Sequence, residues 1–193
     1  GFQGFAAGGI RRRRAGGGTD GRLPDSIRER RESMLTVKLI CAGKMREKFY
    51  IEAYREYEKR LGAFCKLETV EVAEVKCPED PSEKEISNAL EKEAGEILAK
   101  IPSGAYTVAL CVEGQKLSSE ALAALIAERA ARGTSRLCFI IGSSNGLHDR
   151  VKQQADLRLS MSDMTFPHHL ARVMLAEQIY RAFTINAGRK YHK

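Results

Sequence analysis

The chain lacks tryptophan altogether and has only 5 prolines and 4 histidines among its 193 residues. No uninterrupted apolar run approaches the ~20 residues that a membrane-spanning helix needs, so we expect no membrane segment. There is also no P-loop, no H-E-x-x-H and no G-x-S-x-G. The absence of these motifs excludes the best-known signatures of ATP hydrolysis, zinc proteolysis and serine hydrolysis.

The 5 cysteines are odd in number and include no C-x-x-C pair. Three of them lie inside apolar, strand-like runs, which is typical of reduced and buried thiols. We therefore expect a cytoplasmic protein without a disulfide framework. The adjacent His168 and His169 are poor partners for one metal ion, because neighbouring side chains on a helix diverge by about 100°. We expect no bound metal.

The net charge of +7 is unevenly distributed. Residues 1–33 contain 8 arginines, no lysine and 4 acidic residues, a net charge of +4, so residues 34–193 carry the other +3. Such a glycine- and arginine-rich segment is typical of a disordered basic arm that contacts RNA or a membrane, or of a targeting peptide. We favour a third interpretation, upstream sequence that is foreign to the natural protein, because Met34 opens a regular strand pattern.

Residues 34–193 alternate between strand and helix patterns and predict a single domain. Strand patterns occupy 34–43, 65–75, 105–114, 136–142 and 156–162. Apolar residues at helical spacing predict helices over 46–61, after Ser82, after Ser118, around Val151 and over 170–185. Ser82 and Glu85 also match a capping box. The alternation predicts an α/β fold, with a parallel sheet and helices on both faces.

Ligands of open α/β sheets bind at the carboxyl ends of the strands. Three such ends stand out here, from Leu110, Gly142 and Met161 onward. The turn IIGSSNGL (140–147) lets backbone N–H groups approach a ligand, although tight strand-to-helix turns also need glycine for structural reasons. A dinucleotide site is disfavoured, because the first strand ends ICAGKM, with one glycine where G-x-G-x-x-G is expected.

The last predicted helix carries Arg172, Glu177 and Arg181 in an otherwise apolar segment. Its apolar residues are too many for one narrow stripe, which predicts burial on more than one side, including against a second subunit. The chain then ends NAGRKYHK, where an aromatic ring stands among cations. This composition suits stacking on an unpaired base beside a phosphate, and it equally suits a solvated basic tail.

The segments LCFIIGSSNGL, LSMSDMTFPHHLARVMLAEQIYRAFTINAG and the terminal YHK resemble, in order and end point, the bacterial RlmH family. These proteins are small SPOUT-class methyltransferases. The resemblance covers residues 34–193 and implies a C-terminal trefoil knot, a homodimer and S-adenosylmethionine as cofactor. It further implies methylation of N3 of a pseudouridine, at position 1915 in helix 69 of 23S rRNA, in assembled ribosomes.

At the matching positions, the resemblance implies particular site residues. The cofactor site would be formed by Leu110, Gly142, Met161, Ser162, Asp163, Met164, Thr165 and Phe166. We expect His168 to contact the target base, and Arg172 and Arg181 to steady a phosphate or the developing anion, one of them from a partner subunit. The RNA clamp would consist of Tyr191, His192 and Lys193. Two positions depart from the family pattern, since Ser143 replaces a second glycine and Lys190 replaces a proline.

A net charge of only +3 on residues 34–193 predicts a low affinity for protein-free RNA, because that affinity comes from many phosphate contacts. We therefore expect an assembled ribosome, recognised by its shape, as the substrate. Two other functions fit the sequence: a non-catalytic RNA- or ribosome-binding module with the knotted fold, and a knotted methyltransferase that acts on tRNA. Methyl incorporation distinguishes the first from an enzyme, and mapping of the modified nucleotide distinguishes the second.

Overall fold

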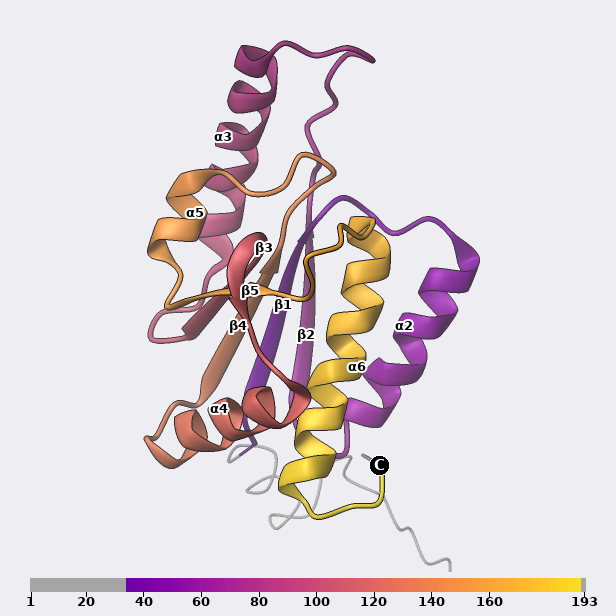
Figure 1. Ribbon diagram of the computed structural model, residues 1–193, viewed down its shortest axis with the longest axis vertical. Helices are drawn as coiled ribbons and strands as arrows, with labels where there is room; N and C mark the ends of the chain where they lie inside the picture. The colour runs from indigo at the N-terminus through magenta and orange to yellow at the C-terminus, as the bar shows by residue number, and fades with distance from the viewer. Residues whose placement is uncertain (1–33, 192–193) are drawn as a thin grey trace, which may run out of the picture. The chain divides into compact units, whose positions relative to one another are not determined.

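The computed structural model describes residues 34–191, which form one five-stranded sheet with helices on both faces (Figure 1). The strands are β1 (Thr36–Ala42), β2 (Lys66–Val72), β3 (Tyr106–Lys116), β4 (Arg136–Ile141) and β5 (Leu157–Ser160). The helices are α2 (Lys48–Leu61), α3 (Glu83–Lys100), α4 (Ser119–Ala131), α5 (Asp149–Gln154) and α6 (His168–Asn186). The sheet order is β2-β1-β4-β3-β5 and every pairing is parallel, so the predicted α/β fold is confirmed. The expectations for residues 1–33, His192 and Lys193 lie outside the described range.

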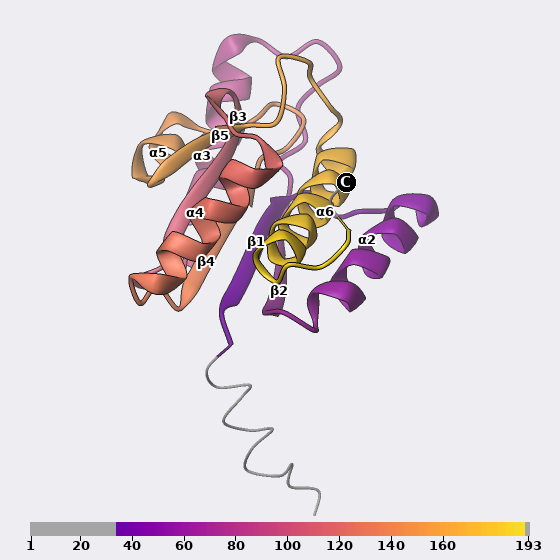
Figure 2. The same ribbon diagram turned by 60° about the horizontal axis from the view of Figure 1, so that its bottom comes forward.

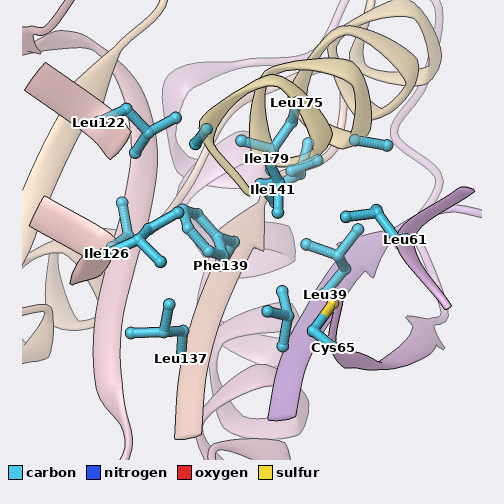
Figure 3. Packing of buried hydrophobic residues seen from close by; sticks show 14 of the residues in the cluster. Leu39, Leu61, Cys65, Leu122, Ile126, Leu137, Phe139, Ile141, Leu175 and Ile179 are labelled. Carbon is cyan, nitrogen blue, oxygen red and sulfur yellow. The ribbon is translucent and has the colours of Figure 1, made fainter. Parts of the chain in front are cut away.

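The central strands are mostly apolar where both faces of the sheet are covered, as in the buried stretches of β1, β4 and the first half of β3. Alternate residues such as Leu39 and Phe139 pack with α2, α4 and α6 (Figure 3), whereas Ile40 and Ile140 pack with α3 and α5. Figure 2 shows the two groups of helices on opposite sides of the sheet. Strand β2 lies at one edge, and its mostly half-exposed residues fit the alternating pattern in the sequence.

The helix ends follow their capping residues. Ser82 and Glu85 form the predicted capping box: the Ser82 hydroxyl accepts from the Glu85 N–H at 3.3 Å, and the Glu85 carboxylate accepts from the Ser82 N–H at 2.9 Å. Helix α6 begins at His168, two residues earlier than predicted, because the fixed φ of Pro167 at the N-cap suits a helix start. None of the helices within residues 34–191 is long and apolar enough to cross a membrane.

Strand β5 pairs with two separate parts of β3. Leu159 is in register with Leu110 and, after a shift, also with Gln115, so residues 111–114 fold around the end of β5. A β-carbon on Gly114 would lie 2.6 Å from the Leu159 carbonyl carbon, which is closer than any side chain tolerates. The close approach of the two backbones therefore requires glycine at this position.

Candidate active site

A pocket of about 710 Å³ opens at the carboxyl ends of β3, β4 and β5, where a ligand of an open α/β sheet is expected. We call it the strand-end pocket. Its walls come from three segments of the chain and from one lysine of α5. The lining residues are 110–113, 141–147, Lys152, 159–162, 164–168 and Ala171.

Of the residues predicted for a cofactor, all but one line this pocket. They are Leu110, Gly142, Met161, Ser162, Met164, Thr165 and Phe166. The exception is Asp163, whose carboxylate instead accepts from the ammonium group of Lys116 at 2.5 Å. The loop is also ordered from within, because the Met164 N–H donates to the Ser162 hydroxyl at 3.0 Å. Asp163 therefore joins the loop to β3 rather than facing the cavity.

The turn after β4 is built so that its backbone faces the cavity. A β-carbon on Gly142 would lie 2.1 Å from the Gly146 carbonyl oxygen, so only glycine fits there. Gly146 has a φ of +89°, a left-handed conformation that glycine adopts without strain, and its N–H donates to the Ser143 carbonyl at 2.9 Å. The two glycines thus serve the fold of a turn that lines the pocket.

The carboxylates of Glu93 and Glu74 anchor this turn by accepting hydrogen bonds from it. Neither residue was among the site residues predicted from the sequence. Glu93 of α3, which is 3% exposed, accepts from the Ser143 hydroxyl at 2.8 Å and from the Val75 N–H at 2.8 Å. Glu74 accepts from the hydroxyl of Ser144 at 2.9 Å and from its N–H at 3.3 Å. Burial raises the pKa of Glu93, and the nearby Glu74 adds to this effect.

A sequence signal for Glu93 did exist. It stands four residues after Ala89 and four before Ile97, so it falls on the apolar side of its helix, where a charged residue needs a buried partner. The identity of that partner could not be read, because Ser143 lies 50 residues away along the chain. No comparable signal marks Glu74, which follows β2 among other exposed acids and lysines.

The adjacent histidines point to different places. His168 lines the pocket, and its Nε2 atom is buried without a hydrogen-bond partner. A β-carbon on Gly43 would lie 3.1 Å from that atom, so the missing side chain of Gly43, whose φ is +83°, makes room for the imidazole. Burial lowers the pKa of His168, and the neighbouring His169 lowers it further. His169 instead contacts the Glu47 carboxylate through Nδ1 at 2.9 Å.

Arg172 lies beneath the site and does not line the pocket. The residue is 2% exposed, and its guanidinium donates to the Glu71 carboxylate at 2.6 Å and to the Gly43 carbonyl at 2.9 Å. The same Glu71 carboxylate also accepts from the Met45 N–H at 3.2 Å. Within the subunit, Arg172 therefore fixes the loop that places Gly43 against His168.

Arg181 belongs to a second cluster, near the other end of α6. Its guanidinium donates to the Glu177 carboxylate at 3.0 and 2.5 Å and stacks over the Tyr191 ring at 4.8 Å. The Tyr191 hydroxyl donates to Glu177 at 3.1 Å. Burial and the Glu177 carboxylate raise the pKa of Tyr191 to about 12, which keeps this hydroxyl protonated. Neither Arg181 nor Tyr191 lines the strand-end pocket.

This geometry is that of an α/β protein with a pocket where its last strands meet its last helix. Residues 35–192 match the family described as "Predicted SPOUT methyltransferase", and the chain therefore belongs to the SPOUT methyltransferase family. The ribosomal RNA large subunit methyltransferase H of Clostridioides difficile (strain 630) is 47% identical over 159 residues, which are 82% of this chain and 100% of that relative. The resemblance to the RlmH family is thereby confirmed.

One solved structure supports the fold, and a second is more distantly similar. A probable methyltransferase from Bordetella pertussis Tohama I superposes with a TM-score of 0.51, at 14% identity, over 81% of this chain and 99% of that one. A probable methylase family protein from Haemophilus influenzae Rd KW20 reaches a TM-score of 0.46, at 12% identity, over 81% of this chain and 70% of that one. At 14% identity, the first likeness concerns the chain path and not the chemistry.

Proposed function

We propose that the protein methylates N3 of a pseudouridine in 23S rRNA, at position 1915 in helix 69, using S-adenosylmethionine and acting as a cytoplasmic homodimer on assembled ribosomes. The observation that carries this proposal is the strand-end pocket, where residues of LCFIIGSSNGL and LSMSDMTFPHHLARVMLAEQIYRAFTINAG meet the second half of β3. The relative from Clostridioides difficile, named as a ribosomal RNA methyltransferase, supports the substrate class.

The pocket fits an adenosyl group. Leu110, Met161 and Met164 offer apolar surface for the faces of a base, and the turn at Gly142 leaves backbone groups free to meet its polar edge. Ser162 and Thr165 add hydroxyl groups at the same wall. When bound, S-adenosylmethionine would supply the methyl group. The protein's own task is to hold the two reactants close and in line.

The target nitrogen must lose a proton before it is methylated, because an imide nitrogen is protonated at neutral pH. Burial lowers the pKa of His168 and so favours the neutral imidazole, which is the form that can accept a proton. We assign to Arg172 a positioning role, since the residue is 2% exposed and its two terminal nitrogens donate to Glu71 and to the Gly43 carbonyl. The expectation that Arg172 touches phosphate is replaced by this assignment.

The length of α6 supports a homodimer. His168 and Arg181 are 13 residues apart on one helix, which is about 20 Å at 1.5 Å per residue. Within one subunit, His168 lines the strand-end pocket and Arg181 does not. We propose that Arg181 and the clamp of Tyr191, His192 and Lys193 serve the pocket of the partner subunit. The pairing of β5 with both ends of the 111–114 loop supports the trefoil knot that the family resemblance implies.

Methyl transfer to ribosomes tests the proposal directly. Ribosomes from a strain that lacks the enzyme would be incubated with the protein and tritiated S-adenosylmethionine, and the labelled nucleotide would be mapped. We expect one labelled pseudouridine per large subunit, and much less label on protein-free 23S rRNA. Label on tRNA alone, or donor binding without any methyl incorporation, would refute the proposed substrate or the proposed activity, respectively.

A further inference from the structure

Four aromatic rings form a continuous series from the strand-end pocket to the surface of α2. The ring centroids of His168 and His169 are 4.1 Å apart, those of His169 and Tyr50 are 6.4 Å apart, and those of Tyr50 and Phe49 are 4.3 Å apart. Phe49 ends the series and is 63% exposed, which is unusual for so large an apolar side chain. The series leads outward from the proposed position of the target base.

The exposed end of the series is surrounded by positive charge. Lys44, Arg46 and Lys48 are all exposed, and none of them forms an ion pair with any residue of the 34–191 range. Glu47 is the one acid between residues 43 and 49, and it contacts His169 at 2.9 Å. We call the group formed by Phe49 and these three cations the β1–α2 surface.

Two helix N-termini add to this positive potential. Both α2 and α6 begin beside the β1–α2 surface, and neither has a side-chain cap or an acidic residue in its first turn. The partial positive charge of these two helix ends is shared by one carboxylate, that of Glu47, which is the N-cap residue of α2 and contacts His169 in the first turn of α6. Figure 1 shows that the two helices run side by side and start at the same edge of the sheet.

The backbone that carries the cations is firmly anchored. Met45 is buried and its N–H donates to Glu71, while the Gly43 carbonyl accepts from Arg172 at 2.9 Å. The charged side chains on either side of Met45 point away from this anchor into solvent, because they are exposed. A fixed backbone reduces the entropic cost of ordering the surface around a ligand.

We propose that the β1–α2 surface binds unpaired RNA nucleotides next to the methylated base. The exposed ring of Phe49 stacks on a base, and the flanking cations contact the phosphates on either side. This inference rests on the proposed function, since it takes His168 as the position of the target base. A second copy of the chain is a poorer occupant, because a two-fold contact would bring three uncompensated cations against their own symmetry copies.

The stacking part is tested by equilibrium binding to large ribosomal subunits from a strain that lacks the enzyme. Phe49→Ala should weaken binding about tenfold, as is usual for the loss of one stacked base. Phe49→Tyr keeps the ring and should bind like the wild type. Because Phe49 is exposed, both variants should keep the wild-type circular dichroism spectrum and melting temperature.

The charge part is tested by a triple variant in which Lys44, Arg46 and Lys48 are each replaced by glutamine. We expect the slope of log affinity against log salt concentration to fall by about 2, as for two to three lost phosphate contacts. The matched control replaces three exposed lysines of α3, on the other face of the sheet, and should leave the slope unchanged. Those control residues are Lys84, Lys92 and Lys100.

Two readouts separate this inference from the proposed function. Calorimetric binding of S-adenosylmethionine should be unchanged in every variant, because none of the altered residues lines the strand-end pocket. Ribosome binding that depends on Phe49, without any methyl transfer by the wild type, would refute the activity and leave the RNA surface standing. Wild-type ribosome affinity in both Phe49→Ala and the triple variant would overturn the inference. A Phe49→Ala protein with half the wild-type molecular mass in light scattering would also overturn it. That result would show that the β1–α2 surface contacts a second copy of the chain.

Discussion

Glu93, a buried carboxylate, joins the turn after β4, which lines the strand-end pocket, to the connection between β2 and α3. Its two oxygens accept from Val75 and from Ser143, so the β2–α3 connection and the turn after β4 are held by one side chain. Ser143 stands where the family usually has a second glycine. In this chain, the Ser143 hydroxyl donates a hydrogen bond to Glu93. This bond restricts the turn before any ligand binds.

The raised pKa of Glu93 predicts a pH-dependent stability. The folded protein binds the Glu93 proton more tightly than the unfolded chain does, so the free energy of unfolding falls as the pH rises from about 4.5 through the folded pKa. Glu93→Gln has one acceptor and one donor but no titratable group, so it should remove this contribution to the pH dependence of the free energy of unfolding. Urea titrations at several pH values would measure it, and an unchanged slope in Glu93→Gln would contradict the prediction.

The matched variant Glu93→Ala loses both hydrogen bonds and leaves the Val75 N–H without its acceptor. We expect it to lower the free energy of unfolding by about 2 kcal/mol. S-adenosylmethionine should also bind more weakly to Glu93→Ala than to Glu93→Gln, because only the alanine frees the turn at Ser143. Equal donor affinity in the two variants would mean that the turn does not need this anchor.

At the scale of whole elements, the contact between β3 and β5 brings two backbones so close that a side chain does not fit between them at Gly114. Gly114→Ala would place a methyl group 2.6 Å from the backbone of Leu159, and backbone cannot move aside as a flexible side chain can. We expect the free energy of unfolding to fall by about 1–3 kcal/mol, which is the usual cost of overpacking a close-packed site. Because the same strands border the pocket, donor affinity should fall as well.

Gly133→Ala serves as the comparison for that variant. Gly133 has a φ of +84° but nothing within 4 Å of an added β-carbon, so its substitution strains the backbone without any clash. It should lower the melting temperature while leaving the affinity for S-adenosylmethionine at the wild-type value. A Gly114→Ala protein with wild-type donor affinity would show that the two-part pairing of β5 does not shape the pocket.

The sequence predicted each element of the sheet but not how the strands are ordered. The strand patterns and the Ser82 capping box depend on neighbouring residues, and they are confirmed. The position of β4 between β1 and β3 depends on pairings between residues about 100 and 30 positions apart, which no local pattern records. The family resemblance added the individual residues 162–166 to strand ends that local patterns had already indicated.

The candidate site was predictable only in part for the same reason. His168 and the strand ends at Leu110 and Gly142 could be named, because each stands at a recognisable boundary between elements. The ring series through His169 to Phe49 could not, because it joins two helices that are far apart in the chain. Likewise, the commitment of Arg172 to Glu71 becomes visible only once α6 lies on the sheet.

On the scale of the whole molecule, the separation of His168 and Arg181 along α6 predicts a shared active site. Subunits that carry His168→Ala and subunits that carry Arg181→Ala should each be inactive alone. When the two are unfolded, mixed and refolded together, half of the dimers are mixed, and each of these has one intact site. We therefore expect about a quarter of the wild-type methyl transfer.

Two controls accompany this measurement. Mixing the two variants without unfolding should give little activity if the subunits exchange slowly, and light scattering should report a dimer throughout. Absence of any activity in the refolded mixture, with dimers present, would place His168 and Arg181 in the same subunit's site. That result would contradict the proposed arrangement while leaving the methyltransferase activity intact.

Strand β5, helix α6 and the loop between them are the last described parts of the chain, yet together they form about half of the wall of the pocket. A nascent chain that has emerged only as far as β4 has most of its sheet and no place for a ligand. A chain cut before β5 would keep four of the five strands but lose every pocket residue from Leu159 to Ala171, and we expect such a product to bind no S-adenosylmethionine.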